Sequence, residues 1–186
     1  MEHTATTLPG VVFCPIGHTL YLGDAAIIDT HAEADDDRSL ASGLVMSSGE
    51  RVFVNTGIES GLVSLMIAAH RGWPGPAERQ GWEDVAEISF VSSSSLLSVL
   101  YFTSLDNGPK SRHTVPLARA VGGEYRARVC ARGRDLFFGL KVDDPVEKYV
   151  IYVWPEPWSE PLLIKRSTNF RFFGRAEGIP WAEGGT

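Results

Sequence analysis

The chain has 186 residues, of which 44% are hydrophobic and 22% charged, and its formal net charge is -6. This length and composition are those of a globular domain and exclude a disordered or collagen-like chain. The acidic balance argues against direct binding to nucleic acid, which relies on clustered Lys and Arg to neutralise phosphates. An acidic surface instead favours solubility or a basic partner.

The N-terminal stretch "MEHTATTLPGVVF" lacks the basic start and the apolar run of a signal peptide, and no segment approaches 18 consecutive apolar residues. We therefore expect a cytoplasmic protein with no membrane span. Because no linker composition interrupts the chain, a single domain is expected over residues 1–186, with loosely ordered ends at 1–10 and 175–186.

Short apolar or alternating runs, separated by turn residues, fill most of the chain. In chain order the predicted strands are 11–14, 18–23, 43–47, 51–56, 61–69, 84–91, 96–103, 113–118, 124–132, 148–154 and 162–166. Helical periodicity is scarce, so at most short helical pieces are expected, at 146–150 or near 168–173. About ten strands of this kind predict an all-β fold, a two-sheet antiparallel β-sandwich.

Glycine-containing connections separate these strands. "SSGE" at 47–50 and "NTGIESG" at 55–61 are both predicted to form hairpin turns. The second is not read as a phosphate-binding loop, because a strand-like run follows it where such a loop needs a helix. The Pro/Gly-rich segment 71–84 predicts a crossover or an irregular surface loop, and Pro155 is expected to end a strand.

Catalytic and metal-binding signatures are absent from the sequence. The five histidines show no HxH or HxxxH spacing, and the serine run 92–95 lacks the glycine-flanked elbow that exposes a nucleophile. Cys14 and Cys130 match no zinc or redox motif. We therefore expect a protein that is not an enzyme and that binds no cofactor and no metal.

An acidic cluster lies in "HAEADDD" at 31–37. A solvated loop accounts for it, since the Asp-x-Asp-x-Asp-Gly spacing of a calcium loop is absent. If the chain binds a basic partner, the candidate contacts in this loop are Asp35, Asp36 and Asp37.

An arginine row lies in "GEYRARVCARGRD" at 123–135. Because side chains alternate along a strand, one set is expected to face the core: Tyr125, Ala127, Val129 and Ala131. The opposite face is expected to carry the candidate partner-binding arginines Arg126, Arg128, Arg132 and Arg134. Guanidinium groups about 7 Å apart repel one another unless anions lie between them. Two interpretations stay open: an internal ladder neutralised by Glu87 and other carboxylates, or a contact surface for an anion or a protein.

Four tryptophans flank two of the connections. Trp73 and Trp82 lie near the two ends of the 71–84 segment, and Trp154 and Trp158 lie on either side of the Pro-Glu-Pro turn at 155–157. Such rings present flat amphipathic area and are candidates for a sugar- or peptide-binding platform. In the alternative interpretation they cover the open ends of the sandwich.

Four blocks of the chain carry a family resemblance: "VFVNTGIESGLVSLMIAAH", "WEDVAEISF", "GEYRARVCARGRD" and "DDPVEKYVIYVWPEP". Their order and spacing over roughly residues 43–157 resemble an uncharacterised actinobacterial family of all-β proteins. More distantly, the layout is similar to the competence protein J group, small all-β inhibitors of a DNA-entry nuclease. The similarity lies in an early Tyr-containing strand, a turn-rich sandwich and a late Gly-x-Tyr-Arg-type strand. This second resemblance implies a nuclease-inhibitor or immunity role and carries over no site residues.

Together these observations lead to a first hypothesis, a non-enzymatic cytoplasmic β-sandwich that binds another protein and acts as an inhibitor or immunity factor for a nuclease or toxin. The alternative is a β-sandwich that binds a small ligand or carbohydrate through its tryptophans.

Overall fold

The computed structural model describes residues 6–13, 18–26, 40–41, 43–77, 79–102, 110–118 and 122–167, and these ranges contain strands and no helix. Accordingly, none of their elements is a helix long and apolar enough to cross a membrane. The strands are β1 (Thr6–Phe13), β2 (Thr19–Asp24), β3 (Leu40–Ala41), β4 (Val45–Ser48), β5 (Arg51–Asn55), β6 (Ser60–Ala69), β7 (Asp84–Ser92), β8 (Leu96–Phe102), β9 (Lys110–Pro116), β10 (Gly123–Arg132), β11 (Lys141–Pro155) and β12 (Leu162–Lys165).

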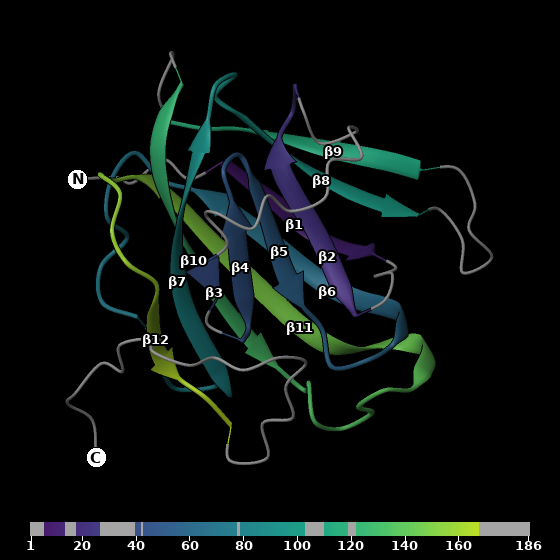
Figure 1. The fold of residues 1–186 in the computed structure, drawn as a ribbon. Coiled ribbons are helices and arrows are strands. Elements are labelled where there is room, and N and C mark those ends of the chain that lie inside the picture. The colour runs from purple at the N-terminus through teal and green to yellow at the C-terminus, as the bar shows by residue number, and fades with distance from the viewer. Residues whose placement is uncertain are drawn as a thin grey trace.

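The strands form two six-stranded sheets that pack face to face (Figure 1). The first, sheet A, has the order β1-β6-β11-β10-β7-β12, and the second, sheet B, has the order β3-β4-β5-β2-β8-β9. The predicted all-β, two-sheet sandwich is confirmed, and each of the eleven predicted strands corresponds to an observed one. The additional strand, β3, has two residues, too few to leave an alternating pattern in the sequence.

One strand pair departs from the predicted antiparallel arrangement. β11 lies between β10 and β6, and it pairs with β6 in parallel. β11 also begins seven residues before the predicted strand, because Asp143, Asp144 and Pro145 have the composition of a loop. The pairing register with β6 shifts between Val142 and Glu147, so this polar stretch is an irregular part of the strand.

The two glycine-containing turns have different roles. Residues 47–50 form the predicted hairpin between β4 and β5, with Gly49 at a φ of 58°. The prediction for 55–61 is wrong: β5 belongs to sheet B and β6 to sheet A, so this segment crosses between the sheets. Apolar strands flank both kinds of connection, and local sequence does not distinguish them.

The ends of the chain were expected to be loosely ordered over 1–10 and 175–186. Residues from Thr6 on belong to β1, which pairs with β6 at an edge of sheet A. The loose order of the two ends stays a prediction. Residues 168–186 lie outside the described residues, and so does the short helical piece that was expected near 168–173. The other expected helical piece, 146–150, is part of β11.

The main core lies between the sheets. Sheet B contributes side chains such as Leu22, Val54 and Val99, and sheet A contributes side chains such as Ile88 and Ile151, all of them fully buried. The predicted inward residues of β10 belong to this core: Tyr125, Ala127, Val129 and Ala131. The sequence pattern therefore predicted the buried face of this strand correctly.

Sheet A is also covered on its outer face. A second apolar cluster there contains Val85, Cys130, Val150 and Ile164, packed against Trp82 and its neighbours. Its cover comes from the 70–83 connection between β6 and β7 and from the residues between β11 and the edge strand β12. As a result, the middle of sheet A is buried on both faces. At its edge, β12 continues the sheet beside β7, as Figure 1 shows.

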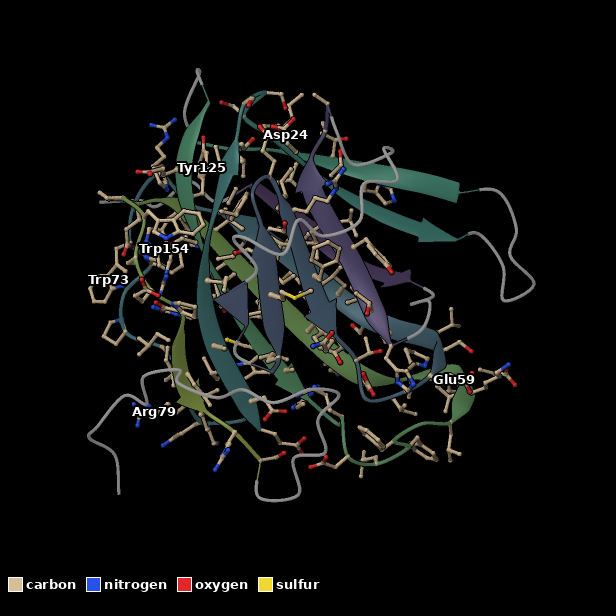
Figure 2. All side chains as sticks on the ribbon, in the orientation of Figure 1. Asp24, Glu59, Trp73, Arg79, Tyr125 and Trp154 are labelled. Carbon is tan, nitrogen blue, oxygen red and sulfur yellow. The ribbon has the colours of Figure 1, made fainter. Side chains whose placement is uncertain are left out.

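Asp24 joins the two sheets at one end of the sandwich, labelled in Figure 2. From the end of β2, its Oδ2 accepts hydrogen bonds from Ser92 Oγ (2.6 Å), Ser94 N (2.8 Å) and Ser94 Oγ (2.8 Å). Ala26 N donates to Oδ1 at 2.8 Å. Burial acts to raise the pKa of Asp24, but these hydrogen bonds outweigh it and hold the pKa below its ordinary value. The serine run therefore serves to hold a buried carboxylate.

Because the folded-state pKa of Asp24 lies below the unfolded value, its stabilising effect is present above about pH 4 and is lost as the pH falls through the folded pKa. We expect Asp24→Asn to lower the free energy of unfolding by about 2 kcal/mol at pH 7. The difference between the wild type and the variant should shrink as the pH falls below about 4. Urea unfolding at several pH values measures this, with the exposed Asp144→Asn as control; a difference independent of pH would contradict the assignment.

Candidate protein-binding surface

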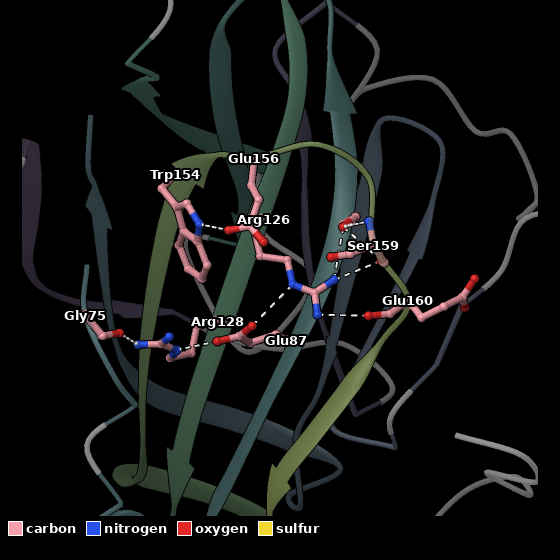
Figure 3. A network of polar contacts seen from close by, with 9 residues as sticks. Gly75, Glu87, Arg126, Arg128, Trp154, Glu156, Ser159 and Glu160 are labelled. Carbon is pink, nitrogen blue, oxygen red and sulfur yellow. Dashed lines mark hydrogen bonds and ion pairs between the residues drawn. The ribbon is translucent and has the colours of Figure 1, made fainter. Parts of the chain in front are cut away.

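The arginine row of β10 is centred on one carboxylate, Glu87 of β7 (Figure 3). Glu87 lies directly across from Arg128 in the antiparallel register, and its Oε1 is 2.7 Å from Arg128 Nε. Its Oε2 is 3.3 Å from Arg126 Nε. The predicted internal ladder, with Glu87 between the guanidiniums, is confirmed.

Backbone carbonyls of the covering segments accept further hydrogen bonds from these two arginines, and Ser89 Oγ accepts one from Arg126 Nη1 at 3.0 Å. Arg126 donates from Nη1 to Ser159 O at 2.9 Å and from Nη2 to Glu160 O at 2.9 Å. Arg128 donates from Nη1 to Gly75 O at 2.9 Å. The two guanidiniums therefore attach both covering segments to sheet A.

The arginine row does not form an exposed contact surface. Arg126, Arg128 and Arg134 are each at most 4% exposed, and each is ion-paired within the chain. The partner-binding interpretation is wrong for these three: the outer face of β10 that carries Arg126 and Arg128 is covered, and Arg134, which follows the strand, is buried against Asp84. Arg132 is exposed, and its guanidinium lies 5.9 Å from the centre of the Trp82 ring. The other predicted partner contacts, Asp35 to Asp37, lie outside the described residues.

The four candidate tryptophans do not form one exposed platform. Trp154 is fully buried, lies 5.2 Å beneath the Arg128 guanidinium and donates through Nε1 to the Glu156 carboxylate. Trp82 and Trp158 are half-buried. Of the four, Trp73 alone is strongly exposed, at 58%. The arrangement favours the alternative interpretation, in which most of these rings close the fold.

Glu87→Gln tests the ladder. The substitution removes the charge between two buried guanidiniums, and we expect a loss of about 3 kcal/mol in the free energy of unfolding, because the arginines are left uncompensated. Urea unfolding monitored by tryptophan fluorescence measures it. Glu160→Gln is the matched control, since Glu160 contributes its backbone carbonyl to Arg126. Equal, small effects of both substitutions would count against a structural role for the Glu87 charge.

A different surface carries the exposed apolar side chains that sequence reasoning missed. The connection between β10 and β11, residues 133–140, exposes Leu136 (69%), Phe137 (40%) and Leu140 (55%). We call these three residues the apolar tip. Large apolar side chains that gather on an exposed loop mark interaction sites more often than single ones do. The available signal was "LFFGL", an apolar run between two predicted strands.

Backbone hydrogen bonds hold the connection in one shape. Within it, Leu140 N donates to Phe137 O at 3.0 Å. Gly139 N donates to Gly57 O at 2.8 Å, and Glu59 N donates to Leu140 O at 2.9 Å. These last two bonds fasten the connection to the 55–61 crossover, near Glu59 in Figure 2. The apolar tip is therefore presented on an ordered backbone.

Buried charges support the base of this connection. Arg134 Nη1 lies 3.0 Å from Asp84 Oδ2. The Glu147 carboxylate accepts hydrogen bonds from Gly57 N at 3.2 Å and Ile58 N at 2.8 Å. Burial raises the pKa of Glu147, although its hydrogen bonds and the charge of Arg134 partly offset this. Tyr149 donates its hydroxyl proton to Glu147, and burial raises the pKa of Tyr149 well above the ordinary value.

Exposed carboxylates flank the apolar tip. Glu59 is bonded through its backbone to Leu140, and Asp143 and Asp144 lie in the irregular stretch at the start of β11. All three side chains are exposed, and we call them the acidic rim. Lys141, also exposed, lies between them in the chain. Within the described ranges, no group of three or more His, Cys, Asp or Glu residues is arranged to hold a metal ion.

Gly57 is the most crowded point beneath the apolar tip. A Cβ at this position would lie 1.8 Å from the backbone oxygen of Arg134. We expect Gly57→Ala to lower the free energy of unfolding by about 3 kcal/mol, because the backbone at Arg134 and the buried Glu147 carboxylate have to move. Gly72→Ala is the matched control, as a Cβ there meets nothing within 4 Å. Thermal and urea unfolding measure both, and an unchanged Gly57→Ala midpoint would refute the close approach.

The fold defines a class of protein, a mixed two-sheet β-sandwich. No protein-family model and no curated protein matches the chain. The structure is similar to that of ComJ from Bacillus subtilis, an inhibitor of the DNA-degrading activity of NucA. The two sequences are 9% identical, the match covers 82% of this chain and 99% of ComJ, and the TM-score is 0.50.

A second solved structure, named as crocagin biosynthetic gene J, shares 14% identity, with 84% of this chain and 99% of that chain covered and a TM-score of 0.49. At such identities the ComJ match shows the fold alone. The layout resemblance to the competence protein J group is thus confirmed at the level of fold. The resemblance to an actinobacterial family stays a prediction.

Proposed function

We propose that this chain is a non-enzymatic protein-binding β-sandwich of the cytoplasm that inhibits a nuclease. The observation that carries the protein-binding part is the apolar tip: three large apolar side chains exposed on a connection with an ordered backbone. Protein interfaces are centred on apolar and aromatic side chains that fill pockets of the partner. An ordered loop also loses little conformational entropy on binding.

The likeness to ComJ supports the choice of a nuclease as the partner. ComJ inhibits the DNA-degrading activity of NucA, and nearly all of its chain is covered by the match. The fold by itself does not specify a function, so the support is an analogy between two proteins of one architecture. A toxin with nuclease activity is a partner of the same chemical kind, for which the chain would act as an immunity factor.

A nuclease-inhibition assay tests this function. We expect the purified chain to inhibit, at near-stoichiometric concentration, at least one DNA-degrading nuclease from its own source organism, measured by release of acid-soluble nucleotides. NucA is a further enzyme for the panel. The variant Leu136→Ser/Leu140→Ser, first shown to unfold at the wild-type temperature, should inhibit at least tenfold less because it lacks most of the apolar tip.

The proposed function would be refuted if no nuclease of the panel lost activity at a molar excess of the chain. Inhibition that the Leu136→Ser/Leu140→Ser variant retained in full would leave the function intact and exclude the apolar tip as its surface.

A further inference from the structure

We propose that the apolar tip and the acidic rim form one docking surface, and that its occupant is a cationic, nucleic-acid-binding protein surface with an apolar pocket at its centre. This inference rests on the proposed function and names the chemistry of the partner. It implies that inhibition arises from competition, because the partner's nucleic-acid site is covered by this chain.

The apolar tip and the acidic rim are parts of one corner of the molecule. Leu140 is hydrogen-bonded to Glu59 through the backbone, and Lys141 pairs with Ser60 where β11 begins beside β6. Asp143 and Asp144 follow Leu140 of the apolar tip by three and four residues in the chain. The corner therefore presents an apolar centre with carboxylates at its edge, the arrangement of core and rim found in protein interfaces.

The charge of this corner indicates which kind of partner surface can bind to it. Its exposed side chains carry three carboxylates and one ammonium group, Lys141, and the whole chain has a net charge of -6. A second copy of the chain would place the same carboxylates against one another, and like charges across an interface disfavour association. A surface that binds nucleic acid carries clustered Lys and Arg, which complement the acidic rim.

The chemistry of this corner is also that of a substitute for a nucleic acid strand. The exposed carboxylates of Glu59, Asp143 and Asp144 are anionic, as phosphates are, and can pair with Lys and Arg side chains of a cationic site, while the apolar tip adds contacts that a phosphate backbone lacks. Backbone hydrogen bonds from the 55–61 crossover fix the connection that carries the tip. Such prior order favours tight binding, since less freedom is lost when the complex forms.

The experiment places a photoreactive residue at the apolar tip of the full chain in cells of its source organism. Phe137→p-benzoylphenylalanine is the probe, and Trp73→p-benzoylphenylalanine is the matched control, because Trp73 is also exposed and is labelled on the opposite side of the molecule from Glu59 in Figure 2. Cross-linked proteins are identified by mass spectrometry. Each is then purified and titrated against the unmodified chain.

The expected result is a cross-link from position 137, and not from 73, to a protein of basic charge. The purified pair should lose at least tenfold in affinity for the variant Asp143→Lys/Asp144→Lys and should weaken steeply with added salt. A double-stranded DNA oligonucleotide should compete with the chain for the partner. The variant's unfolding temperature, measured beside the wild type, shows that the loss does not come from misfolding.

Several results would overturn the inference: no cross-link at 137, a cross-link within the chain or to a second copy, an acidic partner, or binding unchanged by salt and by the lysine variant. The two proposals fail differently. A basic DNA-binding partner without nuclease activity would refute the proposed function and leave the docking surface standing. A nuclease inhibited equally by the wild type and the lysine variant would keep the function and refute the surface.

Discussion

The outer face of sheet A depends on one carboxylate shared by two guanidiniums. Glu87 supplies a single negative charge to Arg126 and Arg128, so the charges alone do not balance. Further hydrogen bonds from the arginines go to Ser89 Oγ and to the backbone carbonyls of Gly75, Ser159 and Glu160. Buried charges are tolerated only when they are paired and hydrogen-bonded, and this requirement determines where the covering segments lie.

How far the sequence predicts this fold depends on which property is considered. The alternation in 124–132 predicted the strand and the core face that contains Tyr125, and the alternation in 84–91 predicted that Glu87 points to the same outer face as the arginines. The same alternation cannot show whether the second face is solvated, because the cover comes from irregular segments distant in the chain. A contact surface therefore stayed one of the two interpretations of the arginine row, although Arg126, Arg128 and Arg134 are buried.

The remaining errors have the same physical origin, since they concern neighbours in space. The 55–61 crossover looks like a hairpin because glycines and flanking apolar runs accompany both. The parallel pairing of β11 with β6 depends on contacts far apart in the chain. The exposure of the apolar tip was not predicted, because an apolar run between two strands has the same composition as a buried segment. Its exposure is a consequence of how the connection passes over the crossover.

The residues that cover the arginines contact sheet A through main-chain atoms. Arg126 binds the carbonyl oxygens of Ser159 and Glu160, and Ser89 Oγ accepts a hydrogen bond from Ser159 N. None of these contacts involves a side chain of the covering residues. Substitutions at 159 and 160 are therefore free to accumulate while the path of the backbone is retained. Across evolution, residues 159 and 160 are expected to diverge in sequence faster than the strands beneath them.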